Sequence, residues 1–85
     1  MADFTKAIQL GSKDAMVYRN RGLVYANQGD DGQAIADYSE AIRLAPDFAE
    51  AYHYRGLVHK KQGEIDKANA DFAKAKKLGF TPTHR

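Results

Sequence analysis

The sequence contains no cysteine, only two prolines and no apolar run long enough to cross a bilayer. Without cysteine, neither a disulfide nor a thiolate metal site can strengthen the core, so packing alone has to hold the fold. A spanning helix needs about 20 apolar residues, and the first residues lack the basic-then-apolar pattern of a signal peptide. We therefore expect a soluble protein. The sequence does not identify its compartment, for which the cytoplasm is the expectation.

A strong net charge is also missing, since 13 Lys and Arg against 11 Asp and Glu give a formal net charge of +2. The two signs are interleaved except at Lys60-Lys61 and between Lys74 and Lys77. This charge is too weak to indicate nucleic acid, so we expect neither a nucleic-acid nor a membrane partner. The 85 residues make one domain at most. A domain of this size buries only about 60% of the surface that its extended chain exposes, so its core is thin.

What the sequence does contain is an internal repeat with a period of 34 residues. Residues 15–48 align with residues 49–82 without a gap, and 13 of the 34 positions are identical. The identical residues in the first unit are Ala15, Tyr18, Arg21, Gly22, Leu23, Val24, Gln28, Gly29, Ala34, Ala36, Asp37, Ala41 and Leu44. The early residues Ala2, Asp3, Ala7, Ile8 and Leu10 match the second half of the same pattern. Residues 1–14 are therefore predicted to be the second half of an earlier unit.

The first part of each unit predicts a helix followed by a glycine turn. Tyr18 and Gly22 recur at helical spacing, and Gly29 provides a flexible C-cap position at the end of the segment. Asp30 and Asp31 come next and are candidates for the N-cap of a second helix.

The second part of each unit predicts another helix, which ends before Pro46 in the first unit. Small residues, Gly22 and Ala34, are expected where the two antiparallel helices cross, with the ring of Tyr38 filling the wider space one turn later. The second unit has Gly56, Ala68 and Phe72 at the corresponding positions.

This pattern resembles the tetratricopeptide repeat (TPR). The resemblance rests on Tyr18, Arg21, Gly22, Tyr25, Ala34, Tyr38 and Pro46, and on Tyr52, Arg55, Gly56, His59, Ala68 and Phe72. His59 and Phe80 depart from it, because the family usually has tyrosine and proline there. It implies an all-α, right-handed α-solenoid of five helices: a partial repeat (1–14), two repeats (15–48 and 49–82) and a tail (83–85). Two unrelated amphipathic hairpins would not explain the gapless register.

The C-terminal end of this predicted array carries polar residues where the first unit is apolar. Ile35 and Ile42 of the first unit become Asn69 and Lys76 in the second. A terminal repeat needs a polar outer face, so the last helix is predicted to be a cap.

The N-terminal end has no such substitution. Phe4, Ile8 and Leu10 belong to a predicted helix that lacks the partner helix of its own repeat. Either the chain is a fragment of a longer array, or these residues form a possible oligomer edge that pairs with a second copy or with another protein.

Charged residues also recur with the repeat. Arg21 and Arg55 stand one period apart, as do Asp3, Asp37 and Asp71. Each planar guanidinium suits carboxylates, so Arg21 is expected to reach Asp3 or Asp37, and Arg55 to reach Asp37 or Asp71. The alternative is that all five are solvated surface charges, each worth under ~1 kcal/mol.

The resemblance further implies a ligand site, because the first helices of TPR units line a concave face that receives a peptide. By position, this groove comprises Met16, Arg19, Asn20, Leu23, Ala26, Asn27, Glu50, His53, Tyr54, Leu57, Lys60 and Lys61. The predicted groove contains three cationic residues and one anionic residue, Glu50, and its leucines provide apolar area. We therefore expect it to bind an acidic and apolar peptide. The alternative is an ordinary solvated helix face with leucines packed between helices. A clamp for chaperone carboxylates is not expected, because Leu23 and Tyr54 replace its polar residues.

Catalysis finds little support in the sequence. His53 and His59 are six positions apart on one predicted helix and point to different sides, so they do not make a zinc pair. Residues 29–32 lack the lysine and hydroxyl of a phosphate loop. We predict no enzyme activity, no cofactor and no metal. Two hypotheses compete with peptide binding: a self-assembling structural segment, and a single-stranded RNA binder, which the period and the low charge disfavour.

Overall fold

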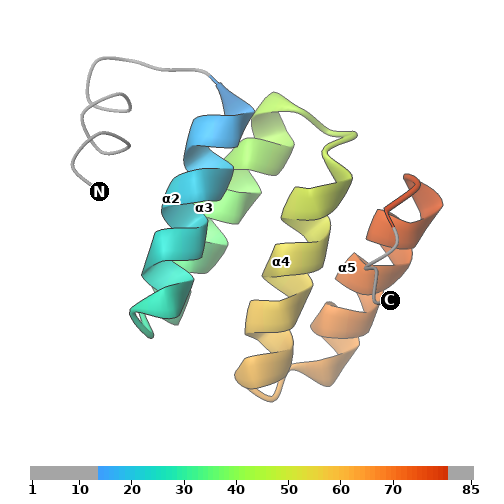
Figure 1. The fold of residues 1–85 in the computed structure, drawn as a ribbon. Helices are drawn as coiled ribbons and strands as arrows, with labels where there is room; N and C mark the ends of the chain where they lie inside the picture. Colours follow the sequence, from blue (N-terminus) through green and yellow to red (C-terminus); the bar gives the residue numbers. More distant parts are fainter. Residues whose placement is uncertain (1–13, 81–85) are drawn as a thin grey trace, which may run out of the picture.

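A computed structural model describes residues 14–80, which fold into four α-helices (Figure 1). These helices are α2 (Ala15–Asn27), α3 (Asp31–Leu44), α4 (Ala49–Lys61) and α5 (Ile65–Lys77). No described residue belongs to a strand, so the all-α prediction is confirmed. The predicted count of five is not reproduced, because the first expected helix falls in residues 1–13, outside the described residues.

The four helices form two antiparallel pairs that stand side by side, α2 with α3 and α4 with α5 (Figure 1). α3 packs against α4 and joins the two pairs, and α2 also contacts α4. The chain reverses direction at every turn, so α2 and α4 run in the same direction (Figure 1). Residues that the sequence separates by one period thus lie at equivalent places in the two helix pairs.

The turn inside each pair depends on a glycine in the left-handed region. Gly29 follows α2 with a φ of 81°, and Gly63 follows α4 with a φ of 84°. After Gly29, the backbone N–H of Asp30 donates to the carbonyl of Tyr25 at 2.8 Å, which closes the turn. α3 ends differently, at Leu44, with Ala45 as the C-cap residue directly before Pro46.

The helix N-termini correct one prediction. Asp14 caps α2, since its side chain accepts a hydrogen bond from the backbone N–H of Met16 at 2.9 Å. Asp30 occupies the N-cap position of α3 but makes no side-chain capping hydrogen bond, and Asp31 is the first residue inside that helix. The predicted position is confirmed, but the capping interaction expected of Asp30 is wrong.

Two glycines allow the helices of each pair to approach closely. A Cβ on Gly22 would lie 2.6 Å from Cε1 of Tyr38, and a Cβ on Gly56 would lie 2.8 Å from Cε1 of Phe72. Neither distance is compatible with a side chain unless the ring shifts. The predicted helix crossing is confirmed, with one difference: the ring lies directly against the glycine rather than one turn beyond it.

The core continues from one pair into the next. Ala34 and Tyr38 of α3 and Val58 of α4 form its buried centre, and Tyr38 is only 1% exposed. The ring of Tyr54 on α4 stacks on Tyr38, with centroids 6.1 Å apart. Burial, with a smaller contribution from Tyr54, raises the pKa of Tyr38 to about 12. This shared aromatic contact fixes α4 against the first pair.

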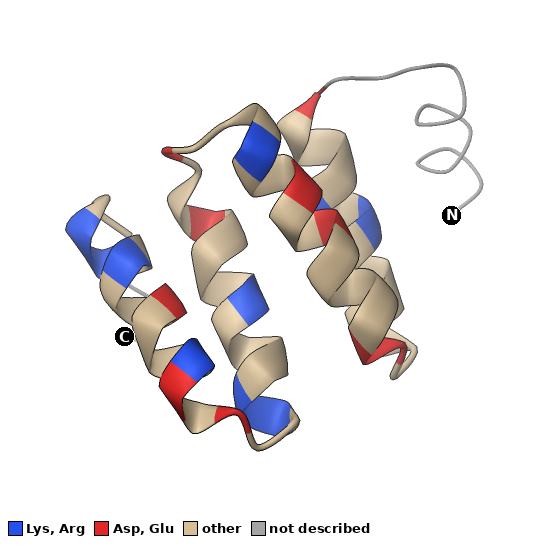
Figure 2. Ribbon diagram, turned by 180° about the vertical axis from the view of Figure 1, so that it is seen from behind, with Lys and Arg blue, Asp and Glu red and all other residues tan. Residues whose placement is uncertain are grey.

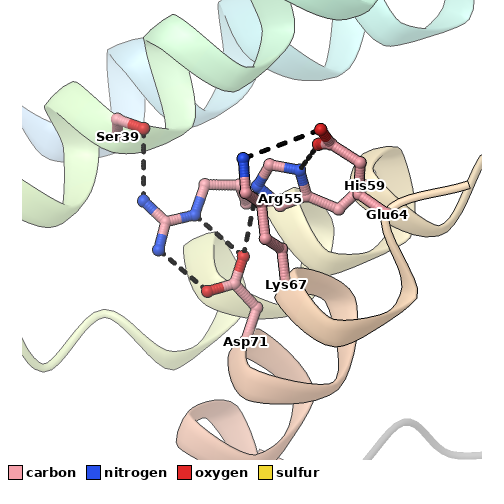
Figure 3. Close-up of polar contacts among 6 residues, drawn as sticks. All are labelled: Ser39, Arg55, His59, Glu64, Lys67 and Asp71. Atoms are coloured by element: carbon pink, nitrogen blue, oxygen red, sulfur yellow. Dashed lines mark hydrogen bonds and ion pairs between the residues drawn. The ribbon is translucent and has the colours of Figure 1, made fainter. Parts of the chain in front are cut away.

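The repeated arginines form ion pairs within their own helix pair. Arg21 donates to both carboxylate oxygens of Asp37 at 2.7 and 2.8 Å. Arg55 donates to both oxygens of Asp71 at 2.8 Å, and also to Ser39 Oγ at 3.2 Å (Figure 3). The two carboxylates are buried, so these are not solvated surface charges. The hydrogen bonds to the two carboxylates raise the pKa of each arginine above its ordinary value.

Candidate functional site

The groove residues predicted from the sequence all lie on α2 and α4, the two helices that run parallel. We call the surface formed by these residues the inner face. They are Met16, Arg19, Asn20, Leu23, Ala26, Asn27, Glu50, His53, Tyr54, Leu57, Lys60 and Lys61. Direct contact between α2 and α4 brings members from both repeats together. The inner face has three parts that differ in charge and burial.

At the N-terminal end of the inner face, Arg19 of α2 forms an ion pair with Glu50 of α4. The Arg19 Nε also donates to Oδ1 of Asn20 at 2.9 Å, and its guanidinium lies over the ring of Phe48, 5.6 Å from the centroid. The expected excess of positive charge is therefore absent here, because the Arg19 charge is compensated by Glu50.

In the middle of the inner face, two predicted residues belong partly to the core. Leu23 is half-buried and packs against the central cluster, as does Tyr54. Leu57 differs, because 44% of it is exposed. At the edge of the same face, Met16 is 53% exposed. The alternative of leucines packed between helices thus applies to Leu23, whereas Leu57 and Met16 offer accessible apolar area.

His53 is surrounded by aromatic rings. Its centroid lies 5.7 Å from that of Tyr54, 5.4 Å from that of Phe72 and 4.8 Å from that of Phe80. Burial lowers the pKa of His53. Sequence reasoning missed Phe80 as a member of this site, and the only signal was its departure from the proline usual at that position.

At the C-terminal end of the inner face, the basic residues are exposed. Lys61 pairs with Asp31 of α3, with 3.0 Å between Nζ and Oδ1. Lys60 and Asn27 are exposed, and Lys60 has no ion-pair partner among residues 14–80. Figure 2 shows positive and negative residues interspersed over the described helices. Lys60 is consequently a local, uncompensated positive charge on the inner face.

The second histidine lies away from the inner face, in the network around Arg55 (Figure 3). His59 is buried, with Nδ1 3.0 Å from Oε1 of Glu64 and Nε2 3.9 Å from Oδ2 of Asp71. Within residues 14–80, no group of three metal-ligating side chains is placed to hold an ion. Through these contacts His59 of α4 reaches Glu64, the N-cap residue of α5, and Asp71 within α5.

Two further observations concern the remaining predictions. No helix in the described part of the chain is long and apolar enough to cross a membrane. The possible oligomer edge, Phe4, Ile8 and Leu10, lies outside the described residues.

Two family models match the sequence, one described as a TPR repeat over residues 27–63 and one as a tetratricopeptide repeat over residues 49–79. Together the two matches span residues 27–79, which is more than half of the chain, and the second match covers both α4 and α5. A search of curated proteins gives no match.

Solved structures with the same fold include the crystal structure of MamA, with a TM-score of 0.84 and 35% identity over 88% of this chain. The match covers 44% of the MamA chain, so the present chain spans less than half of that protein. Another is the second TPR of Spaghetti (RPAP3) bound to the HSP90 peptide SRMEEVD. It has a TM-score of 0.85 and 25% identity, covering 91% of this chain and 67% of that chain.

Proposed function

Because the chain belongs to the tetratricopeptide-repeat family, whose members are protein-interaction modules, we propose that its inner face binds an acidic and apolar peptide. Exposed apolar area on α4 carries this proposal. Leu57 is a large aliphatic residue with 44% of its surface in solvent, and Lys60 lies one helical turn further along α4. An apolar side chain of the ligand would cover Leu57, and an acidic one would lie near a cation.

The RPAP3 complex supports a peptide as the class of ligand. That protein holds the peptide SRMEEVD, which combines glutamates and an aspartate with apolar Met and Val. Acidic and apolar side chains of this kind also suit the cations and the exposed Leu57 of the inner face. The carboxylate clamp remains unexpected here, because Leu23 and Tyr54 replace its polar residues. We accordingly propose a non-enzymatic adaptor rather than a chaperone-specific clamp.

The proposed domain organisation places the inner face in two full repeats of a right-handed solenoid, residues 15–48 and 49–82. Within α5, Asn69 and Lys76 are exposed, whereas their counterparts Ile35 and Ile42 on α3 are partly covered. This difference supports α5 as the capping helix of the array. The inner face would then be the interaction surface, with the outer side of α5 left to solvent.

Peptide titration tests this function. A library of acetylated and amidated octapeptides, each with two leucines and several glutamates in varied positions, is titrated into the labelled full chain. We expect some members to shift the backbone amide signals of Arg19, Leu57 and Lys60 together in heteronuclear NMR spectra. No binding, or shifts confined to α5, would contradict the proposal.

Two matched variants locate the binding surface. Leu57→Ser removes an exposed aliphatic residue from the inner face, and Ile65→Ser removes one from α5, where 48% of it is exposed. The lost apolar contact should weaken peptide binding about tenfold in Leu57→Ser. Ile65→Ser should bind as the unaltered protein does. Equal losses in the two variants would show that the inner face has no special role.

A further inference from the structure

The ion pair between Arg19 and Glu50 lies inside the proposed binding surface, and its two members differ in how firmly they are held. The Arg19 side chain is 14% exposed, whereas the Glu50 side chain is 41% exposed. Arg19 keeps a hydrogen bond to Asn20 and its contact with the ring of Phe48 without any help from Glu50. Among residues 14–80, Arg19 is the only hydrogen-bond or ion-pair partner of the Glu50 carboxylate.

This asymmetry means that the pair can open from one side. Rotation of Glu50 into solvent leaves its carboxylate hydrated, because the side chain is already near the surface. Arg19 stays in place, since Asn20 and Phe48 still position its guanidinium. An opened pair therefore presents a preorganised, partly buried guanidinium that lacks an anion.

We propose that Glu50 is an internal competitor, whose carboxylate occupies the position that an acidic side chain of the bound peptide takes on Arg19. The inference rests on the proposed function of the inner face as a peptide-binding surface. Binding of an acidic peptide exchanges one carboxylate for another on the same guanidinium. Glu50 thus lowers the affinity for acidic peptides. Only a ligand whose other contacts with the inner face are favourable enough displaces Glu50 from Arg19.

Lys61 of the inner face already pairs with Asp31. Lys60 is the remaining cation of the inner face, and it is a weaker anchor than Arg19. It is exposed on a flexible side chain, so fixing it costs side-chain entropy and its charge is screened by salt. It also lies in the last turn of α4, where the helix dipole favours a cation and disfavours a bound anion. A guanidinium, by contrast, binds a carboxylate through a planar fork. The acidic residue of the ligand is therefore assigned to Arg19.

The experiment compares two substitutions that remove the same charge. Glu50→Gln removes the competitor, and Glu40→Gln removes a carboxylate that pairs with Arg43 on α3. Each variant is titrated with a glutamate peptide from the octapeptide library and with its glutamine counterpart, in which every glutamate is replaced. Glu50→Gln should bind the glutamate peptide about tenfold more tightly, because a charge-assisted hydrogen bond no longer has to be exchanged.

The controls separate this effect from a general change in charge. The glutamine peptide should bind Glu50→Gln and the unaltered protein with affinities within about twofold. Glu40→Gln should leave the affinity for both peptides unchanged. In the unaltered protein, the Nε–Hε signal of Arg19 should move on addition of the glutamate peptide and stay in place with the glutamine peptide.

Two outcomes would overturn the inference, and they are distinguishable. If the glutamate peptide binds Glu50→Gln and the unaltered protein equally, with the usual shifts on α2 and α4, the competitor role is wrong and the proposed function stands. If no peptide binds either protein, both the competitor role and the proposed function fail.

Discussion

The two helix pairs have the same arginine at the same repeat position but use it differently. Within residues 14–80, Arg21 hydrogen-bonds only to Asp37 of its own pair. Arg55 binds Asp71 in the same way and also reaches Ser39 on α3 of the first pair. The arginine of the second pair therefore also links the two pairs, because α3 of the first pair supplies an acceptor for its guanidinium.

The pairs also differ in how tightly their ring and glycine meet. Tyr38 is fully buried against Gly22, because α4 covers it from the other side. Phe72 lies against Gly56 but is only half-buried. The ring in the first pair is therefore the more completely enclosed of the two, and substitutions can test that difference.

The largest effect is expected from Gly22→Ala. The new Cβ would lie 2.6 Å from the ring of Tyr38, which has no room to shift. We expect the free energy of unfolding to fall by about 3 kcal/mol, measured by urea denaturation. Gly56→Ala should cost less, since Phe72 is half-buried and its ring can tilt. Equal losses at the two glycines would show that the difference in burial of the two rings does not matter for stability.

Gly32→Ala is the matched control for both substitutions. Gly32 lies in α3, and a Cβ there would meet nothing within 4 Å. The same chemical change should therefore raise the free energy of unfolding by roughly 0.5 to 1 kcal/mol, through helix propensity alone.

An intermediate effect is expected from the arginines. Arg55→Met leaves the buried Asp71 without its cation and Ser39 without its donor, so we expect a loss of about 2 kcal/mol in unfolding free energy. Arg21→Met leaves only Asp37 without a partner, so the loss in unfolding free energy should be about half as large, about 1 kcal/mol. Thermal and urea unfolding measure both. Unchanged or raised stability in Arg55→Met would mean that the pairing has no structural importance.

The smallest effect concerns pH and the second pair alone. Burial lowers the pKa of His53 below its ordinary value of 6.5, so the folded protein binds a proton less readily than the unfolded chain. Stability should therefore fall as the pH drops below about 6.5. The measurement is the thermal midpoint between about pH 7.5 and about pH 5. A His53→Phe variant keeps the aromatic cluster and should show a shallower pH dependence; an identical slope would exclude His53 as the cause.

Much of the backbone could be predicted from the sequence, because the repeat imposes local rules at particular residues. Gly29 and Pro46 end helices for backbone reasons that do not depend on the rest of the fold. The spacing of Gly22 from the second helix then predicts which surfaces meet. The ion pairs of Arg21 and Arg55 follow the same period, although the sequence predicts them only as a choice between two carboxylates each.

The chemistry of the inner face could be predicted only in part. Helical spacing assigns its residues to one side but gives no rotamers. Arg19 and Glu50 are 31 positions apart, and their pairing depends on how α4 is placed against α2. The half-burial of Leu23 and Tyr54 depends on the same placement, because both pack on a cluster shared between the pairs. A sequence pattern found within one repeat does not predict the contacts between side chains of two repeats.

The backbone after α5 turns at Gly79, with a φ of 99°, and the amide of Phe80 bonds to the carbonyl of Ala75 at 3.0 Å. The ring of Phe80 then rests on His53. Together with Tyr54 and Phe72, this ring surrounds the imidazole with aromatic carbon, so a ligand reaching His53 on the inner face would meet an aromatic surface around the imidazole.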